Sequence, residues 1–585
     1  MAEQPRKDVV IVGYGAGGGP ASVELARAGL SVVALERGPH WTAQRDFTPS
    51  QLDTLRWVVR DGMIPDFDRM PLTFRENADD EAVPTKYLMS TLVGGATVHW
   101  SGQSWRFFED DFRMKSTVEE MYGSERLRHL EEDGASIADW PISYDDVEPY
   151  YERVETHIGI GGWPGNIQGR IRPVKADEGN PFEAPRQNDF PFRPLRDNAT
   201  NLTYRYGALE LGLHPFHVPT AILTRPYMSP YGISRPPCTY CTFCTGHGCW
   251  NASKSDTRVS LLPAAEATGN FELRSGCHVT RVNHENGRAV SVEYVDTQTG
   301  ETHTQPGDIF LLAAYTFQNV RLLLHSGIDG GGRVGQHFMT RSAPSVSGIF
   351  SDRHLNGFNG PAVQRQGLDD FNGEVAFERK MELPDDEFFI RGAFMGSPSQ
   401  RNPLETYGAV VPPGVPRWGP AFKDHVTENL NRYIGLQLLT EPMPYEHARI
   451  DLDPNHRDQY GVPAARVTRR IGENERRMGR FIHERGVEIL RAAGASRVWG
   501  SPEVSSIPSM THDTGGLRMG DDPGESVTNR YCQMWDMPNV FIGSGAVFPT
   551  MAGKNPTETI WMLSYWLADA IVQQRVDLED AQNIT

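Results

Sequence analysis

Four of the six cysteines fall within twelve residues. Cys238, Cys241, Cys244 and Cys249 give the spacing C-x2-C-x2-C-x4-C. This is close to the ferredoxin run C-x2-C-x2-C-x3-C-P, in which one loop reaches several corners of an iron-sulfur cluster. Structural zinc sites usually use two cysteine pairs that lie farther apart. The spacing predicts a [4Fe-4S] cluster; a [3Fe-4S] cluster that leaves one cysteine unused, a zinc ion and free thiols are the alternatives.

A second pattern able to do chemistry lies near the N-terminus. Gly13, Gly15 and Gly18 form G-x-G-x-x-G directly after an apolar run, and Glu36 ends the next apolar run. The first glycine allows a tight turn, the second lets a pyrophosphate approach the backbone, and the third lets helix and strand pack closely. The helix N-terminus then faces the phosphates. Glu36 would accept the ribose hydroxyls and repel a 2′-phosphate, so NADP is disfavoured, but the choice between FAD and NAD stays open here.

Alternating strands and helices are expected to position these residues. Around the glycines we expect a strand at Asp8–Val12, a helix at Pro20–Ala28 and a strand at Ser31–Leu35. After the cysteines we expect a helix at Thr257–Thr268 and strands at Phe271–Val282 and Asp308–Ala313, as more of the same nucleotide domain. Cys277 and Cys532 stand alone in apolar contexts and are expected to be buried small hydrophobes.

The middle of the chain has a different pattern. Between Val334 and Ala464, strand-like segments such as Glu374–Phe377, Tyr433–Leu439 and Ala448–Leu452 alternate with Gly/Pro-rich loops, which favours a mostly antiparallel sheet. Apolar residues then recur at helical spacing over Glu473–Ala493. The tail predicts a strand from Val540, a Gly-rich turn and a helix from Pro556 to Gln573.

Three separated parts of the chain together resemble the glucose-methanol-choline oxidoreductase family, whose members bind FAD and oxidise alcohols. They are the N-terminal glycine pattern, the loop Val93–Gly102 (VGGATVHWSG), and a tail composed of His512–Gly520 (HDTGGLRMG), Gly543–Pro549 (GSGAVFP) and Asn555-Pro556. The resemblance implies an α/β fold with a Rossmann-like FAD-binding domain of the p-hydroxybenzoate-hydroxylase-like type. It also implies an α+β substrate domain built on a mostly antiparallel sheet.

The resemblance assigns roles to individual residues. His512 and Asn555 would face the flavin from the substrate side, with His512 taking the hydroxyl proton and Asn555 orienting the hydroxyl. The cofactor contacts implied are Gly13, Gly15, Gly18, Glu36, Gly94, Gly95, Thr97, His99, Trp100, Ser101, Gly102, Val279, Ala313, Gly545, Ala546, Pro556 and Thr557. Ser544 departs from the pattern, because many members have an acidic residue there. His99-Trp100 is similar to the segment through which pyranose oxidases attach flavin covalently. The two alternatives are therefore a covalent bond from His99 to the flavin and a His99 side chain that packs beside the flavin without a bond.

Within that family, the cysteine segment resembles the iron-sulfur-containing sugar dehydrogenases, namely the large subunits of gluconate, fructose and glucose dehydrogenases and the glucoside 3-dehydrogenases. Its fourth cysteine favours the glucoside 3-dehydrogenase type. The expected reaction is oxidation of a CH–OH group of a sugar or glycoside, as from a secondary alcohol to a 3-keto-glycoside. A cluster accepts electrons one at a time from reduced flavin for an external carrier, so we expect a small helper subunit and a cytochrome or another acceptor. The alternatives are an oxygen-using alcohol or pyranose oxidase with a structural metal site, and a flavin electron-transfer protein without alcohol chemistry.

The resemblance also suggests a division of the chain into five ranges. Residues 1–105, 196–333 (with cysteines 238–249) and 505–585 are expected to form the FAD-binding domain, residues 106–195 an insertion and lid on the substrate side, and residues 334–504 the substrate-binding domain.

Composition excludes some partners and suggests a location. The net charge of −18, from 57 Lys and Arg against 75 Asp and Glu, opposes a polyanionic partner such as nucleic acid. No window approaches the roughly 20 apolar residues that span a bilayer. The polar start Met1–Lys7 leads straight into a predicted strand, so the expected location is the cytoplasm, or the periplasm if a partner subunit carries the export signal.

Overall fold

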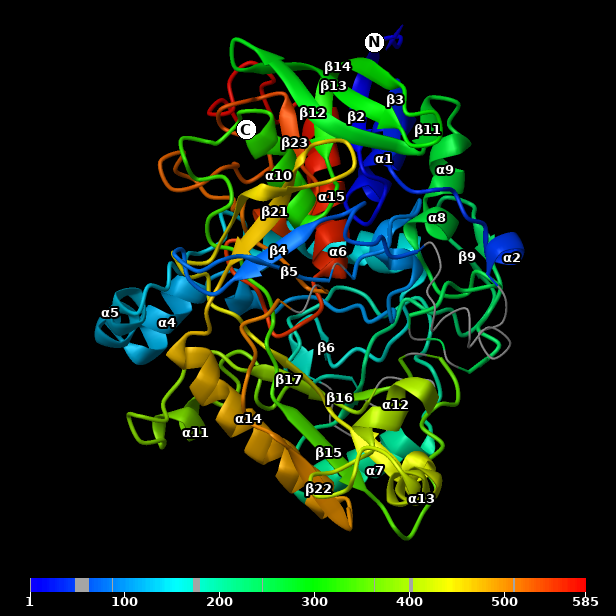
Figure 1. Cartoon of the computed structure of the whole chain (residues 1–585), viewed down its shortest axis with the longest axis vertical. Coiled ribbons are helices and arrows are strands. Elements are labelled where there is room, and N and C mark those ends of the chain that lie inside the picture. The colour runs from blue at the N-terminus through cyan, green and yellow to red at the C-terminus, as the bar shows by residue number, and fades with distance from the viewer. Residues whose placement is uncertain are drawn as a thin grey trace.

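The computed structural model describes residues 2–47, 63–86, 88–171, 179–242, 244, 246–361, 363–398, 403–508 and 511–584. In Figure 1 the upper half of the molecule contains a large sheet with both chain ends beside it, and the lower half contains smaller sheets crossed by one long helix. No helix within the described ranges combines the length and the apolar character needed to cross a bilayer.

The upper sheet has a parallel core with the order β11-β3-β2-β14-β23. Its strands are β2 (Lys7–Val12), β3 (Val32–Glu36), β11 (Phe271–Ser275), β14 (Thr302–Leu312) and β23 (Val540–Ile542). Strands of such a sheet are covered on both faces, which is why the central segments Val9–Val12, Val32–Leu35 and Ile309–Leu312 are apolar and buried; the edge strand β11 (FELRS) is more exposed. Three helices pack on this core, namely α1 (Gly18–Arg27), α10 (Thr316–His325) and α15 (Thr557–Val572).

Strand β14 joins two sheets into one. Its second half pairs in parallel with β2 and β23, while its first half pairs antiparallel with β13 (Arg288–Asp296), which in turn pairs with β12 (Cys277–Glu285). The short β1 (Ala2–Glu3) lies along the same half of β14.

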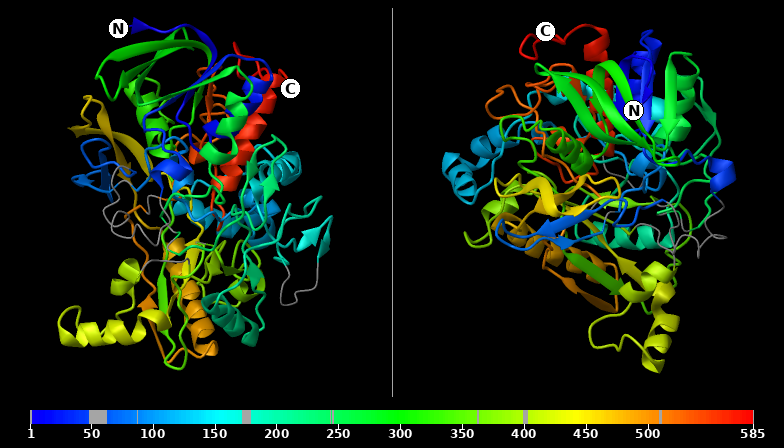
Figure 2. Two further views of the ribbon diagram at one scale, coloured as in Figure 1. Left: turned by 90° about the vertical axis from the view of Figure 1, so that its right-hand side faces the viewer. Right: turned by 45° about the horizontal axis from the view of Figure 1, so that its top comes forward.

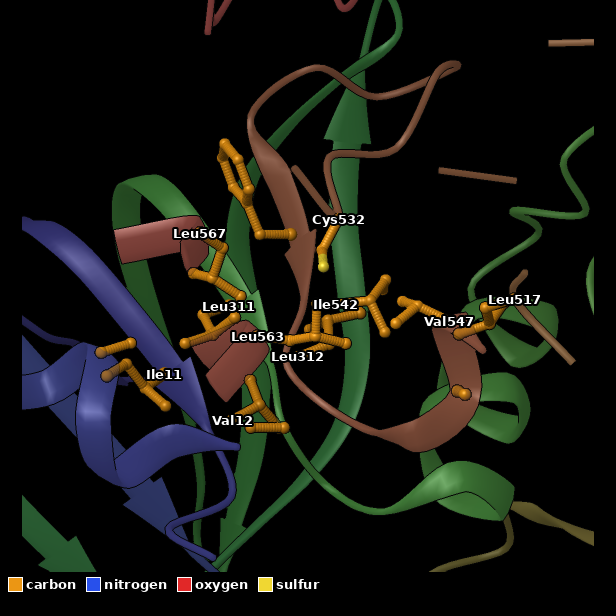
Figure 3. Close-up of a cluster of buried hydrophobic side chains, with 14 of the residues drawn as sticks. Ile11, Val12, Leu311, Leu312, Leu517, Cys532, Ile542, Val547, Leu563 and Leu567 are labelled. Atoms are coloured by element: carbon orange, nitrogen blue, oxygen red, sulfur yellow. The ribbon is translucent and has the colours of Figure 1, made fainter. Parts of the chain in front are cut away.

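The core beneath this sheet is built from both ends of the chain. Figure 3 shows Ile11 and Val12 beside Leu311 and Leu312, with Ile542 and helix residues Leu563 and Leu567 completing the cluster. All of these side chains are buried. Strands β2 and β23, which lie near opposite ends of the chain, are therefore held together by one continuous apolar layer.

The lower half contains an antiparallel sheet of order β19-β17-β16-β8 and another of order β18-β15-β22. Their strands are β8 (Phe216–His217), β15 (Ser345–Ile349), β16 (Gln366–Leu368), β17 (Ala393–Gly396), β18 (Tyr433–Gly435), β19 (Gln437–Thr440) and β22 (Arg497–Ser501). Helix α14 (Glu473–Ala492) packs against these strands and against α7 (Ala199–Glu210). Helices α12 (Pro403–Ala409) and α13 (Pro420–Asn429) project from this half in the left view of Figure 2.

A four-stranded sheet of order β20-β21-β4-β5 lies between the halves. It consists of β4 (Leu72–Arg75), β5 (Val83–Pro84), β20 (Arg449–Arg457) and β21 (Pro463–Thr468). The other helices are α2 (Ala43–Asp46), α4 (Met114–Tyr122), α5 (Ser124–Glu132), α6 (Tyr144–Val154), α8 (Thr257–Ser260), α9 (Leu262–Glu266) and α11 (Phe377–Met381). Two-residue strand pairs β6 (Asn166–Ile167) with β7 (Arg170–Ile171), and β9 (Tyr227–Met228) with β10 (Ser234–Arg235), complete the fold.

Four local predictions were wrong. The single strand expected at Tyr433–Leu439 is broken at Leu436 into β18 and β19, which belong to different sheets. Glu374–Phe377 is not a strand but a turn that leads into α11, because the carboxylate of Glu374 is buried in an ion pair with Lys380. The helix expected at Thr257–Thr268 is broken at Leu261, before a proline, into α8 and α9. The strand expected at Phe271–Val282 is broken at Gly276, whose φ of +76° turns the chain from the β3 side of the sheet to the β13 side. The fold class is confirmed, and the five domain ranges stay a prediction.

Candidate functional site

A cavity of about 480 Å³ lies at the carboxyl ends of β2, β3, β14 and β23. In open parallel sheets ligands bind at this edge. Most of the predicted site residues line the cavity: Gly13, Gly15, Glu36, Gly95, Thr97, His99, Trp100, Ser101, Val279, Ala313, Gly545, Pro556, Thr557, His512 and Asn555. Gly18, Gly94, Gly102 and Ala546 do not line it, although each is next in the chain to a residue that does.

The N-termini of three helices meet at the cavity. Its lining includes Gly17 at the start of α1, Tyr315 and Thr316 at the start of α10, and Pro556 and Thr557 at the start of α15. Helix N-termini present unpaired N–H groups and a partial positive charge. The site therefore suits an anionic ligand such as a pyrophosphate.

The glycines near the N-terminus serve different purposes. A Cβ atom at Gly13 would lie 2.7 Å from the carbonyl oxygen of Ala313, and one at Gly18 would lie 2.5 Å from that of Gly13, so both are required by packing. A Cβ atom at Gly15 would meet no described atom closer than the Cα of Gly95 at 3.8 Å. The protein's own packing does not require glycine at position 15, which fits a cofactor that approaches the backbone there.

Glu36 is fixed at the end of β3. Its two carboxylate oxygens accept hydrogen bonds from the backbone N–H groups of Tyr14 (2.9 Å) and Gly38 (2.8 Å). Burial raises the pKa of Glu36, and these bonds oppose the rise. The carboxylate borders the cavity with lone pairs left for further donors, such as ribose hydroxyls.

The loop Val93–Gly102 is attached to the segment that follows the cysteines. The Thr97 hydroxyl donates to the Gly94 carbonyl (2.5 Å) and accepts from the backbone N–H of Thr257 (3.1 Å). The indole N–H of Trp100 donates to the Ser255 carbonyl (2.9 Å). Gly94 and Gly95, with φ of +98° and +55°, make the tight turn that brings His99 to the cavity edge.

His512 and Asn555 meet on the cavity wall although 43 residues separate them. The Asn555 amide nitrogen lies 2.8 Å from Nε2 of His512. Because an amide NH₂ only donates, Nε2 is the unprotonated nitrogen in this pair. Burial, together with the nearby Arg341 guanidinium, lowers the pKa of His512 to about 3. The ring is therefore a neutral proton acceptor at neutral pH.

Asp513 and Tyr315 are part of the same wall and are bonded to each other. The Tyr315 hydroxyl donates to the Asp513 carboxylate (2.6 Å), and the Thr316 hydroxyl donates to the Asp513 carbonyl (2.7 Å). Burial raises the pKa of Asp513 to about 6. Tyr315 has a φ of +73°, which is strained for a bulky residue. Its position fixes the chain next to His512.

Some residues of the site were not predicted from the sequence. The cavity lining also includes Tyr315, Gln437, Gly17 and Gly246. Arg341 lies close enough to lower the pKa of His512. Tyr315 follows a predicted strand of the parallel sheet by two residues, a position that typically faces a ligand. Gly17 lies so close to β23 that a Cβ atom there would be 1.5 Å from the Gly543 carbonyl oxygen, a long-range contact without a local signal.

The cysteine segment lies beside the loop Val93–Gly102, called the flavin loop below; its residue Gly246 lines the cavity, whereas the four cysteines do not. Burial raises the pKa of Cys238 to about 12, and the thiols of Cys241, Cys244 and Cys249 are near enough to contribute to that rise. Backbone N–H groups of Tyr240 and Lys254 point at the sulfurs of Cys238 (3.3 Å) and Cys249 (3.4 Å). The donor type and the N–H···S contacts suit a thiolate-bound cluster. Across the described residues, however, no three His, Cys, Asp or Glu side chains lie close enough together to bind one metal ion.

Known proteins resemble this chain over nearly its whole length. Two models of the GMC oxidoreductase family match, an N-terminal one at residues 233–342 and a C-terminal one at residues 444–564. The gluconate 2-dehydrogenase flavoprotein of Pantoea cypripedii is 32% identical over 98% of this chain and 94% of its own. The fructose dehydrogenase large subunit of Gluconobacter japonicus is 25% identical over 97% of each chain.

A solved structure agrees at the level of the fold. The pyridoxine 4-oxidase structure from Mesorbium loti covers 96% of this chain and 98% of its own with a TM-score of 0.56, at 14% identity. The glycine contacts, the three helix N-termini and the carboxylate at the end of β3 fit FAD. The chain belongs to the GMC oxidoreductase family of FAD-binding enzymes that act on CH–OH groups.

Proposed function

We propose that this enzyme is a dehydrogenase that oxidises a secondary CH–OH group of a sugar or glycoside to a ketone, such as a 3-keto-glycoside. Cys238, Cys241, Cys244 and Cys249 would hold an iron-sulfur cluster, which would supply a route for electrons from reduced flavin to an external acceptor. The observation that carries the proposal is the contact between His512 and Asn555 on the cavity wall.

The two side chains can divide the work on a substrate hydroxyl. FAD, when bound, supplies the acceptor of the hydride. His512 takes the hydroxyl proton at Nε2, the atom that Asn555 now approaches, so the substrate oxygen enters between the two groups. The Asn555 amide then donates to that oxygen, while its own carbonyl oxygen, which has no partner among the described residues, is left to accept from a neighbouring substrate hydroxyl.

The names of two relatives support a sugar-type substrate. A gluconate 2-dehydrogenase and a fructose dehydrogenase both act on polyhydroxylated carbon chains, and both align over nearly the whole chain. The cavity lining includes the polar side chains of Ser90, Ser101 and Gln437, which can bind several hydroxyls at once.

An exit for electrons through the cysteine segment is supported by a buried lysine. The Lys254 ammonium donates to the carbonyls of His247 (2.6 Å) and Trp100 (2.8 Å), so one side chain joins the cysteine loop to the flavin loop. Cys249 lies on the same loop as His247, and Gly246 borders the cavity. A cluster on this loop would lie next to the flavin loop and could pass electrons on one at a time.

We further propose a helper subunit and a cytochrome-type or other carrier as the acceptor. Support comes from the relative named as the large subunit of fructose dehydrogenase. If the helper carries an export signal, the enzyme acts in the periplasm; without one it acts in the cytoplasm.

One experiment tests most of the proposal. Purified enzyme is analysed for iron and then mixed anaerobically with a panel of sugars, glycosides and simple alcohols while flavin absorbance is followed. We expect iron near cluster stoichiometry and bleaching by a sugar or glycoside. His512→Ala should retain flavin but lose bleaching; unchanged bleaching in that variant would favour electron transfer without alcohol chemistry.

The remaining outcomes point elsewhere. Substrate-dependent peroxide in air without iron would identify an oxidase and refute the cluster. Acid precipitation distinguishes the two states of the flavin, because FAD bound covalently through His99 stays with the pellet. Cys238→Ser and Cys249→Ser should lose iron, whereas Cys532→Ser, at a buried cysteine outside the segment, should not.

A further inference from the structure

A row of aromatic side chains connects the cavity with the protein surface. It begins at Trp100, which lines the cavity. Trp561 packs edge-on against it, with ring centroids 5.1 Å apart and planes at 89°. Trp561 is fully buried, and none of the described residues accepts a hydrogen bond from its indole nitrogen.

The row continues along α15 and leaves it through a hydrogen bond. Tyr565 lies one helical turn after Trp561, on the same face, where Cβ atoms are about 6 Å apart. Its hydroxyl oxygen lies 3.1 Å from that of Tyr231. Tyr565 is fully buried and Tyr231 is partly exposed, so the row reaches solvent at this second tyrosine.

The outer end has a fixed proton acceptor. The Tyr231 hydroxyl donates to one carboxylate oxygen of Glu24, while the other forms an ion pair with Arg153 at 2.5 Å. Burial raises the pKa of Tyr231, as do the neighbouring Tyr565 and Glu24, so the phenol keeps its proton in the resting protein. Loss of an electron makes a phenol strongly acidic, and Glu24 is in place to take the proton.

Simple core packing does not account for this row. Phe would fill the place of Trp561 without leaving a buried N–H group unpaired, which destabilises the folded state. Trp and Tyr are, among aromatic side chains, the ones that give up an electron most readily. Trp566, on the same helix, is different: its N–H donates to the Arg530 carbonyl (2.8 Å) and its ring stacks on Tyr531, away from the row.

We propose that Trp100, Trp561, Tyr565 and Tyr231 form a single-electron path between the FAD cavity and the surface. The oxidant in the cavity is photoexcited FAD, or a one-electron oxidant formed when reduced FAD meets oxygen. It gains one electron; Tyr231 loses one electron and passes its phenol proton to Glu24; the other three side chains return to their starting states. A small thiol or ascorbate-type reductant in solution then restores Tyr231.

The path would protect the active site. A reactive oxidant beside His512 would damage the site itself, whereas an oxidised tyrosine at the surface can be reduced from solution. The inference requires bound FAD but not the proposed substrate or cluster, so it can fail while the proposed function stands.

The test uses the FAD-loaded enzyme without substrate or oxygen. A blue light pulse excites the flavin, and transient absorption and electron paramagnetic resonance follow the radicals. In the unmodified protein we expect a long-lived tyrosyl radical together with one-electron-reduced flavin. Trp561→Phe and Tyr565→Phe should each abolish the tyrosyl signal, and Glu24→Gln should shorten its lifetime because the proton acceptor is lost.

Trp566→Phe is the matched control, since it removes one indole from the same helix outside the row. Flavin absorbance verifies that each variant is loaded. Equal tyrosyl yields in Trp561→Phe, Tyr565→Phe and the unmodified protein would overturn the proposal, as would an equal loss in Trp566→Phe.

Discussion

The proton acceptor His512 should keep working in acid far below the usual range of histidine. The pKa of His512 is lowered from 6.5 to about 3 by burial and by Arg341. A histidine accepts a proton only above its pKa, so the rate of flavin bleaching should fall only as the pH approaches about 3. At pH 5 an ordinary histidine would be about 3% neutral and this one about 99%, a difference of about thirtyfold in the competent fraction.

The assay is anaerobic stopped-flow bleaching at limiting substrate between about pH 4.5 and 8. His512→Gln should lower the rate by about 10²–10⁴-fold at every pH while FAD stays bound. His337→Asn is the matched control, because His337 is also a buried histidine with a pKa of about 3 but does not line the cavity. Asp513 has a pKa of about 6, so its Asn variant must be measured too. An acid limb near pH 6.5 that survives in Asp513→Asn would refute the reasoning.

Four further variants probe the structure around the site. Gly15→Ala should fold with nearly unchanged stability but lose FAD affinity, since a Cβ atom there meets no described atom closer than 3.8 Å. Gly13→Ala should destabilise the fold itself, because its Cβ atom would lie 2.7 Å from the Ala313 carbonyl oxygen. Flavin titration and thermal unfolding separate the two effects. Asp513 has a folded pKa of about 6 against 3.8 when unfolded, so its contribution to stability is present at low pH and is lost as pH rises through 6. Between about pH 4 and 8, the free energy of unfolding of Asp513→Asn should therefore rise by about 2 kcal/mol relative to that of the unmodified protein, or about 2 °C in Tm for a chain of this length. A difference in stability that does not depend on pH would contradict the raised pKa of Asp513. Lys254→Met leaves two buried carbonyls without a donor, at a cost of about 1–3 kcal/mol each. It should lower the ratio between the rate of electron delivery to an external acceptor and the rate of flavin bleaching. An unchanged ratio would show that Lys254 is not part of the proposed electron exit.

The parallel core could be predicted from sequence because its strands are buried on both faces. Asp8–Val12 and Ser31–Leu35 fall within one residue of β2 and β3 at each end, and the long helix predicted at Glu473–Ala493 ends one residue earlier in the structure. Uninterrupted apolar runs and 3.6-residue periodicity are local signals, so a single sequence contains them.

One failure depends on tertiary contacts, whereas the breaks at Leu261 and Gly276 come from a nearby proline and from the glycine itself. Nothing near Glu374 indicates that Lys380 and Arg391 will bury its charge and replace a strand by a turn. Local signals were also overlooked: Ser143 and Asp146 form a capping box that marks the start of α6.

The site was predictable as a set of residues but not as an arrangement. His512 and Asn555 could be named from the family resemblance, yet their 2.8 Å contact and the effect of Arg341 on the pKa of His512 require the folded chain. The catalytic roles and the cluster ligands stay predictions. The family, the fold class and the action on CH–OH groups are confirmed by the matches over the whole chain.

The contact between Gly17 and Gly543 has a consequence for how the enzyme is made. The Ser564 hydroxyl also bonds the Gly17 carbonyl (2.6 Å), so the wall of the FAD site uses the two ends of the chain. At about 5–20 residues per second, a ribosome needs roughly 25–100 s to travel from β2 to β23. During that interval the first strands exist without the neighbour that completes their sheet. Flavin can be loaded only after translation is almost finished, so the nascent chain must be kept from aggregating by means other than its cofactor.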